Sequence, residues 1–298
     1  MANARALDKR RKSIRNIRKI TRTMELIATA RYKKAMDRAA AATAYTDQIT
    51  KIVSQLADAG TDVQHPLLEQ REKIRSSRVL VLASNRGLCG GYNASILRTA
   101  MPHIKQVREE VANVSIDASG KRGVNGLKFR GIETDNQYLQ FEDQPAYDEV
   151  EKIANDYLAQ YITGKIDRLD VIYTKFISTS KQIPMVETLL PLGSLGDEAD
   201  TPEIAGAAGS ENSQYEFLPS AESILEEVVP TSFKVKLFKC FLDSAVSEQV
   251  ARMIAMKGAT ESAGDMIKQL SMTYNRARQS QITGEIMEII GGVEALEG

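Results

Sequence analysis

The fold is decided by residues 13–27, which read SIRNIRKITRTMELI. Apolar side chains recur there at helical spacing, and the pattern continues without a proline to residue 56. A second proline-free stretch, residues 232–293, repeats apolar residues at intervals of mostly three, four or seven. At 1.5 Å per residue these helices would be about 65 Å and about 90 Å long, far longer than an ordinary globular helix. The two ends of the chain are therefore predicted to form one long helical pair.

We expect these two helices to pack against each other over several turns. The side chains expected in the seam or against it are Ile17, Ile20, Ile27, Val250, Met253 and Ile267. A long helical pair does not form the concave pocket in which enzymes bind small substrates. The feature therefore favours a protein that transmits or holds over one that catalyses.

The segment between the helices has a different period. A continuous apolar run at residues 78–83 predicts a buried strand, and a glycine-rich turn at 84–91 leads from it into a helix near 93–108. The later elements are expected as strands at 113–118, 137–141, 170–178 and 183–190, and as helices at 121–129 and 147–162. This alternation predicts a small, Rossmann-like α/β domain with a partly parallel sheet.

The predicted organisation therefore has four parts. These are an N-terminal coiled-coil helix (1–60), an α/β domain (75–192), a flexible loop (193–219) and a C-terminal coiled-coil helix (220–298). Pro230 is expected to end a short helix at 220–229, because proline cannot donate a backbone hydrogen bond. Thr231 or Ser232 would then cap the long terminal helix.

The net charge of zero hides a polarity along the chain. Residues 1–40 contain thirteen Lys or Arg and three Asp or Glu, a balance of 13 − 3 = +10, so the remainder sums to −10. Beyond Arg278 there are no basic residues. Bases at a helix N-terminus and acids at a C-terminus oppose the helix dipole, so another surface must account for the pattern. Either the basic segment meets an acidic partner, which is a nucleic acid or a protein, or its charges act against another surface of an assembly.

Composition excludes several classes of protein. No apolar run approaches the roughly 18 residues of a membrane span, and no apolar signal-peptide core follows the N-terminal charges. Cys89 and Cys240 fit no metal-ligand spacing and are expected to be free thiols. His65 and His103 are isolated in sequence and are expected to be surface or turn residues.

The glycine-rich turn could bind phosphate, because phosphates bind where a strand enters such a turn and opens a helix. It lacks both Gly-x-Gly-x-x-Gly and Gly-Lys-Ser/Thr, so a tight turn between strand and helix is the favoured interpretation. No histidine lies near Cys89 in sequence, which argues against a nucleophilic thiol. A small α/β phosphate-binding enzyme with helical dimerisation arms stays open as the alternative. The basic arm has few aromatic residues, so helix packing is favoured over nucleic-acid binding.

Three separated segments resemble one known family. They are residues 14–28, the turn Asn85-Arg86-Gly87-Leu88-Cys89-Gly90-Gly91-Tyr92-Asn93, and residues 247–288 with Arg278-Gln279 and Ile282-Thr283. Together with 175–177 and 189–191, they resemble the gamma subunit of F-type ATP synthases in the family's order along essentially the whole chain. There are two departures: Asn85 stands where the family usually has Asp, and Val293 follows Gly292 where Gly-Ala is usual.

The resemblance implies a fold and a set of partners. The terminal helices would form an antiparallel, left-handed coiled coil inside a ring of alpha and beta subunits, and the α/β domain would be a foot on the membrane c-ring with the epsilon subunit. The chain would be a non-catalytic rotor without a cofactor, peripheral to the cytoplasmic face of a bacterial inner membrane, coupling proton or sodium flow to ATP synthesis. Partner contacts are expected at Met24, Arg86, Cys89, Tyr215, Phe217, Arg278, Gln279 and Thr283.

Overall fold

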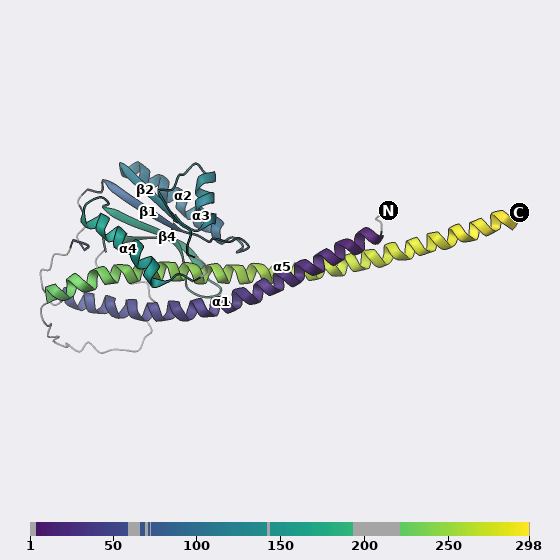
Figure 1. The fold of residues 1–298 in the computed structure, drawn as a ribbon, viewed down its shortest axis with the longest axis horizontal. Helices are drawn as coiled ribbons and strands as arrows, with labels where there is room; N and C mark the ends of the chain where they lie inside the picture. The colour runs from purple at the N-terminus through teal and green to yellow at the C-terminus, as the bar shows by residue number, and fades with distance from the viewer. Residues whose placement is uncertain are drawn as a thin grey trace. The chain divides into compact units, whose positions relative to one another are not determined.

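The computed structural model describes residues 4–58, 66–68, 71, 73–141, 144–192 and 221–297. In chain order, a long helix at each end flanks a five-stranded sheet with its own helices (Figure 1). The chain divides into two compact units. We call residues 1–30, 88–90 and 251–298 the helical unit, and residues 31–87 and 91–250 the α/β unit. The loop predicted at 193–219 lies outside the described residues.

The two terminal helices are confirmed. Helix α1 runs over Ala4–Asp58 and has 55 residues. Helix α5 runs over Ala221–Glu297 and has 77 residues. No helix in the described part of the chain is long and apolar enough to cross a lipid bilayer.

The prediction that Pro230 ends a separate helix is wrong, because Pro230 lies inside α5. The residues on either side of it explain why the helix continues. Val229 is 1% exposed and Phe233 is fully buried, and both belong to the main apolar core. Packing of this face outweighs the hydrogen bond that proline cannot make. Thr231 does not act as an N-terminal cap, since its hydroxyl donates to the carbonyl of Glu227 one turn earlier, at 2.8 Å.

The α/β unit is built on one mixed sheet, as expected. The strands are β1 (Ser76–Leu82), β2 (Asn113–Ser119), β3 (Asn136–Tyr138), β4 (Arg168–Phe176) and β5 (Gln182–Leu190). Their order in the sheet is β3-β2-β1-β4-β5. The pairs β1/β2, β1/β4 and β2/β3 are parallel, and β5 pairs antiparallel with β4 at the edge. The central strand β1 is buried from Val79 to Leu82, which is why its sequence is continuously apolar.

Three shorter helices cover the sheet. They are α2 (Tyr92–Glu110), α3 (Lys121–Phe129) and α4 (Tyr147–Ile162). Helix α4 packs through Val150, Tyr157 and other buried residues onto the main core, which also contains Leu80 and Leu82 of β1. The part of α5 between Val229 and Phe241 belongs to the same core, so α4 and this part of α5 share one side of the sheet (Figure 1). Helices α2 and α3 lie on the other side.

Buried hydroxyl groups fix α5 to the α/β unit. The Tyr92 hydroxyl donates to the carbonyl of Ser244 at 3.1 Å and lies 2.6 Å from its Oγ. The Ser247 hydroxyl donates to the carbonyl of Thr174 at 3.1 Å. Because these groups are shielded from water, losing one partner would leave the other unsatisfied. The contacts therefore position the part of α5 before Ala251 within the α/β unit.

Candidate partner-binding surface

The helical unit is a seam between the start of α1 and the second half of α5, which run side by side (Figure 1). On α1 the covered side chains recur every seven residues, and Ala28 is 1% exposed. This series is Leu7, Ile14, Thr21 and Ala28. On α5 the buried residues Met256 and Ala263 are also seven apart. The expected pairing of the terminal helices is confirmed.

Polar contacts cross this seam. Thr260 Oγ1 lies 2.9 Å from Thr21 Oγ1, and the Arg11 guanidinium lies 4.7 Å from the centre of the Tyr274 ring. Glu25 is 9% exposed, and one of its oxygens accepts from Arg22 at 2.7 Å. Small and polar side chains such as Thr21, Ala28 and Thr260 therefore share the seam with Leu7, Ile14 and Met256.

The expectation places Ile17, Ile20 and Ile27 in the seam or against it, and the structure shows that they do not lie in it. Their side chains are 48%, 59% and 46% exposed. The seven-residue repeat instead turns Thr21 and Ala28 toward the partner helix, and these isoleucines flank it. Of the expected α5 residues, Val250 is fully buried, whereas Met253 and Ile267 are partly buried.

The helical unit carries an open, strongly basic groove with a volume of about 1160 Å³. It is lined by Lys12, Arg15, Asn16, Arg18, Lys19, Arg22, Thr23, Thr260 and Ile267. Five of these side chains are cationic and none is acidic. Such a surface attracts carboxylates, and each exposed ion pair contributes only about 0.2 to 1 kcal/mol. The groove therefore suits an acidic partner that makes several contacts at once.

The end of α5 presents a different surface. Every side chain from Arg278 to Val293 is exposed. Large apolar residues recur among them at spacings of three, four or seven. They include Ile282, Ile286, Ile289 and Val293, which are 43% to 67% exposed. A helix face of this kind fits a surrounding partner better than it fits water.

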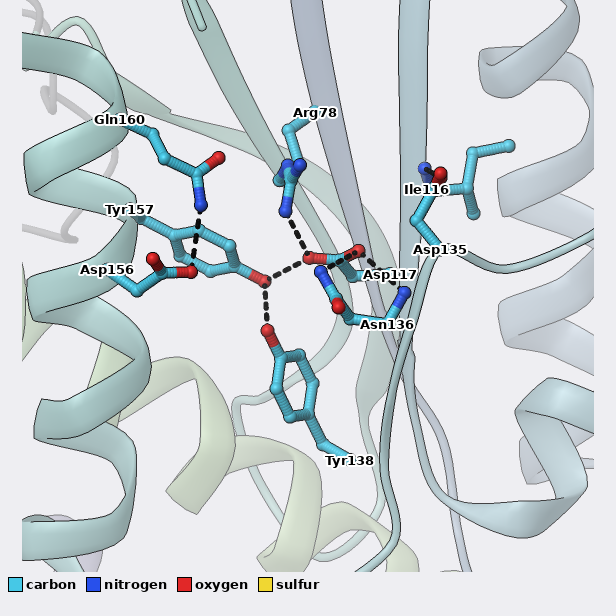
Figure 2. A network of polar contacts seen from close by, with 9 residues as sticks. All are labelled: Arg78, Ile116, Asp117, Asp135, Asn136, Tyr138, Asp156, Tyr157 and Gln160. Atoms are coloured by element: carbon cyan, nitrogen blue, oxygen red, sulfur yellow. Dashed lines mark hydrogen bonds and ion pairs between the residues drawn. The ribbon is translucent and has the colours of Figure 1, made fainter. Parts of the chain in front are cut away.

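In the α/β unit, a network of polar side chains surrounds Asp117 (Figure 2). Asp117 of β2 is fully buried and accepts from Arg78 at 3.1 Å, Tyr157 at 2.8 Å and Asn136 at 3.1 Å. Burial raises the pKa of Asp117, although the Arg78 charge and the hydrogen bonds oppose this effect. Both carboxylate oxygens are occupied by the protein itself. The network holds β1, β2, β3 and α4 together and leaves Asp117 little capacity for a substrate.

The expectation that His103 is a surface or turn residue is wrong, because His103 contacts the buried carboxylate of Asp170. His103 Nε2 on α2 lies 2.8 Å from Asp170 Oδ2 on β4, and the His103 side chain is 13% exposed. Burial would raise the pKa of Asp170, but hydrogen bonds from His103 and Thr188 and the charge of Arg168 lower it overall. Histidine spacing in the sequence gave no sign of this partner, because the two residues are 67 positions apart. His65 lies outside the described residues.

The glycine-rich turn is closed by its own hydrogen bonds. Asn93 Oδ1 accepts from the backbone N–H of Ser84 at 3.0 Å, and the Ser84 hydroxyl donates to the carbonyl of Arg86 at 2.6 Å. Close to it, Gly120 has a φ of +91°, and a Cβ atom there would lie 2.1 Å from the carbonyl oxygen of Ala83. The hydrogen bonds of Ser84 and Asn93 favour a tight turn over a phosphate site.

Comparison with known proteins identifies the family. The family model described as ATP synthase matches residues 3–296. An ATP synthase gamma chain from Rhodopirellula baltica is 86% identical over 298 residues, the full length of both chains. The chain belongs to the ATP synthase gamma chain family. The gamma chain of Leptospira biflexa is 37% identical over 99% of this chain and all of its own.

Solved structures show the same fold. The rotor of the Euglena gracilis mitochondrial ATP synthase matches with a TM-score of 0.60 and 17% identity, covering 94% of this chain and 98% of its own. A chain of the OSCP/F1/c-ring assembly from the same organism matches with a TM-score of 0.63 and 17% identity, covering 98% of this chain and 94% of its own. The coiled coil and the central α/β domain are thus the architecture of ATP synthase central stalks.

The partner contacts expected for a gamma chain can now be placed. Arg278, Gln279 and Thr283 are exposed on the end of α5, and Met24 is half-buried on α1. Tyr215 and Phe217 lie outside the described residues. These positions stay predictions.

In the glycine-rich turn, Arg86 is exposed, but Cys89 is only 2% exposed. The exposed apolar side chain of the turn is that of Leu88, at 58%. Sequence reasoning missed Leu88, because nothing in the sequence distinguishes which of two adjacent apolar residues turns outward.

Asn85, one of the two departures from the gamma chain pattern, has a local explanation. Its amide nitrogen donates to the carbonyls of Leu139 and Phe141, and its oxygen accepts from the backbone N–H of Lys121 at 3.0 Å. An ionised aspartate could accept from Lys121 but could not donate to either carbonyl. Asn85 therefore ties the turn to the segment after β3. The other departure, Val293, is 50% exposed.

Proposed function

We propose that this chain is the central-stalk rotor subunit of an F-type ATP synthase. It would couple proton or sodium flow through the membrane ring to ATP synthesis in the catalytic head. Its partners would be the alpha and beta subunits, the epsilon subunit and the c-ring. The observation that carries the proposal is the 86% identity to an ATP synthase gamma chain over the full length of both proteins.

In this proposal the chain itself is non-catalytic and works by contact. A rotor changes the conformation of its partners only if its surface interacts more favourably with one conformation than with another. The basic groove on one side of the helical unit and the exposed apolar end of α5 make that surface asymmetric. Each rotor angle would then favour a different state of each beta subunit.

The location that follows is peripheral, on the cytoplasmic face of a bacterial inner membrane. The bacterial relatives support this location. The chain would be held there by the c-ring and would not enter the lipid.

Copurification tests the assembly. A tagged copy of the full chain, expressed in its own cells and extracted from membranes in mild detergent, should bring down alpha, beta, epsilon and c subunits in stoichiometric amounts. A tagged chain that elutes alone, with the other subunits recovered as a complex without it, would refute the proposal.

Calorimetry tests the non-catalytic role. The purified chain should show no micromolar binding of ATP and no ATP hydrolysis, because no lysine-bearing phosphate loop is present in the sequence. Micromolar binding of ATP would revive the alternative of a phosphate-binding enzyme.

The role of the basic groove is tested by charge removal. Replacing Arg15, Lys19 and Arg22 by Gln should slow association with the catalytic head, and the deficit should shrink at high salt. The matched control is Lys105→Gln on α2, whose side chain is 81% exposed and lies outside the groove. Equal association rates for the triple variant and the control would show that the groove is only a solvated surface.

A further inference from the structure

The last part of α5 extends beyond the start of α1 (Figure 1). Thr21 lies 2.9 Å from Thr260 across the antiparallel seam, so 17 residues back along α1 and 17 residues on along α5 bring Ala4 level with Ala277. Helix α1 as described begins at Ala4. Residues 278–297 of α5 therefore have no α1 beside them, and we call them the overhang.

The overhang carries a coiled-coil stripe that no other described part of the chain covers. Its apolar residues follow one another at intervals of four, three, four and three, which is the spacing of a coiled-coil seam. They are 43% to 89% exposed, and they are Ile282, Ile286, Ile289, Val293 and Leu296. Ile290 flanks the stripe and is 55% exposed.

This stripe is not the unused end of the seam with α1. The seam on α5 includes Met256 and Ala263, and further steps of seven residues lead to Leu270, Ala277 and Gly284. None of these residues belongs to the stripe of the overhang. The sequence therefore builds a second seam on a different face of α5, and that seam needs a second helix.

Glycines make the overhang a weak helix without such a helix. Gly284, Gly291 and Gly292 lie within it, and among the amino acids only proline is less favourable than glycine in a helix interior. A Cβ atom at any of the three would meet nothing within 4 Å, so no contact in the described part of the chain requires glycine there. A helix packed on the stripe would hold the overhang in its helical form.

The charges at this end of the helical unit are complementary to each other. Beyond Arg278 the sequence has four glutamates and no lysine or arginine. The start of α1 is basic, and Lys9 and Arg10 are exposed there. Each of the two patterns opposes the dipole of its own helix. An arrangement that brings the acidic end of one chain to the basic start of another would relieve both.

We propose that two free copies of this chain dimerise through their overhangs, as an antiparallel pair with its two-fold axis near Ile289. In this register Ile289 meets its own counterpart and Ile290 lies beside it. The stripe is then covered along its whole length, because Ile286 meets Val293 and Ile282 meets Leu296.

The same register accounts for the charges. Residue 297 of one copy comes level with residue 281 of the other, about one helical turn from the level at which α1 of that copy begins. The acidic end of each α5 thus lies near the basic start of the other copy's α1. A second copy supplies both the apolar stripe and the charges that the overhang lacks. The inference concerns the free chain and stands apart from the proposed function.

The contact is small, so the dimer should be weak. Six apolar side chains from each copy form less than a standard interface, and we expect a micromolar Kd. Sedimentation velocity of the full chain between about 1 and about 100 µM should show a monomer converting to a species of twice its mass. No larger species should appear, because a two-fold contact is closed.

Two aspartate variants test the stripe. Ile289 and Met287 are 67% and 65% exposed on the overhang, but Met287 lies outside the stripe. Ile289→Asp places two carboxylates face to face at the centre of the pair and should weaken the Kd at least about 50-fold. Met287→Asp adds the same charge and should change the Kd less than about threefold. Both side chains are exposed, so circular dichroism should show folded chains in both cases.

Cysteine variants test the direction of the pair. Ile289→Cys should form a disulfide with its own counterpart under mild oxidation. Ile282→Cys should not, because its counterpart would be 14 residues, or about 20 Å, away along the pair. Mixing Ile282→Cys with Leu296→Cys should restore the cross-link. The wild type is the control, since its Cys89 and Cys240 are both 2% exposed.

Several results would overturn the inference. One is a wild-type chain that stays monomeric at about 100 µM. Equal loss of the dimer in Ile289→Asp and Met287→Asp would show that the stripe is not the contact, and efficient self-cross-linking of Ile282→Cys would show that the pair is not antiparallel. If wild type and Ile289→Asp are both monomers and the variant is impaired only in binding alpha and beta subunits, the stripe serves the catalytic head and not a second copy.

Discussion

Replacing Asp243 should make the protein more stable at neutral pH. Asp243 lies on α5 in the α/β unit and is 6% exposed. Burial raises its pKa from 3.8 to about 6, the charges of Lys239 and Lys175 partly oppose the shift, and the charge of Glu187 adds to it. The folded protein therefore binds a proton at Asp243 more tightly than the unfolded chain does.

Because the folded state binds the proton of Asp243 more tightly than the unfolded state does, the free energy of unfolding falls as the pH rises. Below about pH 4 the carboxyl group is protonated in both states and has no cost. As the pH rises through the folded pKa of about 6, the buried group must ionise and stability is lost. The difference between 3.8 and about 6 corresponds to roughly 3 kcal/mol, because one pKa unit equals about 1.4 kcal/mol.

Asp243→Asn keeps the shape of the protonated acid and removes the charge. The variant should match the wild type near pH 4 and exceed its free energy of unfolding by up to roughly 3 kcal/mol above pH 7. Urea denaturation followed by circular dichroism, at half-unit steps from pH 4 to 8 and constant ionic strength, measures this difference. Glu109→Gln is the control, since the Glu109 side chain is 68% exposed and its removal should give no comparable trend.

The prediction depends on the pH trend and not on the absolute stabilities. A difference between Asp243→Asn and wild type that stays constant from pH 4 to 8, or that favours the wild type above pH 7, would refute the reasoning.

Three further predictions concern the assembly and the backbone. If the Arg278 guanidinium pairs with a desolvated carboxylate of a partner, Arg278→Ala should reduce ATP synthesis in the reconstituted complex more than Lys33→Ala, because leaving that carboxylate unpaired costs about 2 to 5 kcal/mol. Both residues are exposed, so neither change should alter the Tm of the isolated chain. Equal turnover would make Arg278 a solvated residue. Gly120→Ala should destabilise the α/β unit by at least about 3 kcal/mol, measured by urea denaturation, because its Cβ atom would overlap the carbonyl of Ala83. Ala28→Leu should lower the thermal midpoint of helicity by overpacking the seam, whereas Ile20→Ala should leave it nearly unchanged.

The sequence predicted every strand and helix of the α/β domain to within a few residues, because most of them combine a clear period with turn residues. The strand at 137–141 had only a weak signal, and β3 is correspondingly short, Asn136–Tyr138. The sequence predicted the wrong stripe of α1 for the seam, whereas the α5 residues Val250, Met253 and Ile267 are covered at least in part. Isoleucine marks helical periodicity strongly, whereas the seam is built with Thr21 and Ala28, which carry little hydrophobic signal. On a long helix more than one stripe has helical spacing, and the partner helix decides which of them is covered.

Other errors share a cause. Proline usually ends a helix, but the free energy gained by burying Phe233 exceeds the cost of placing Pro230 inside α5. His103 lacks partners nearby in sequence, but β4 brings Asp170 to it. In the candidate surface, local sequence could identify the turn and the basic arm, yet it could not show that Leu88 faces outward and Cys89 inward, because that depends on how the turn packs against α5.

The seven-residue repeat of Leu7, Ile14, Thr21 and Ala28 has a mechanical consequence. A repeat of 3.5 residues per turn winds two helices around each other in a left-handed sense, like the strands of a rope. Torque applied in the sense of this winding tightens the two helices around each other, and torque in the opposite sense unwinds them. The torsional stiffness of such a rotor would therefore differ between the two directions of rotation, and so would the elastic energy stored during ATP synthesis and during ATP hydrolysis.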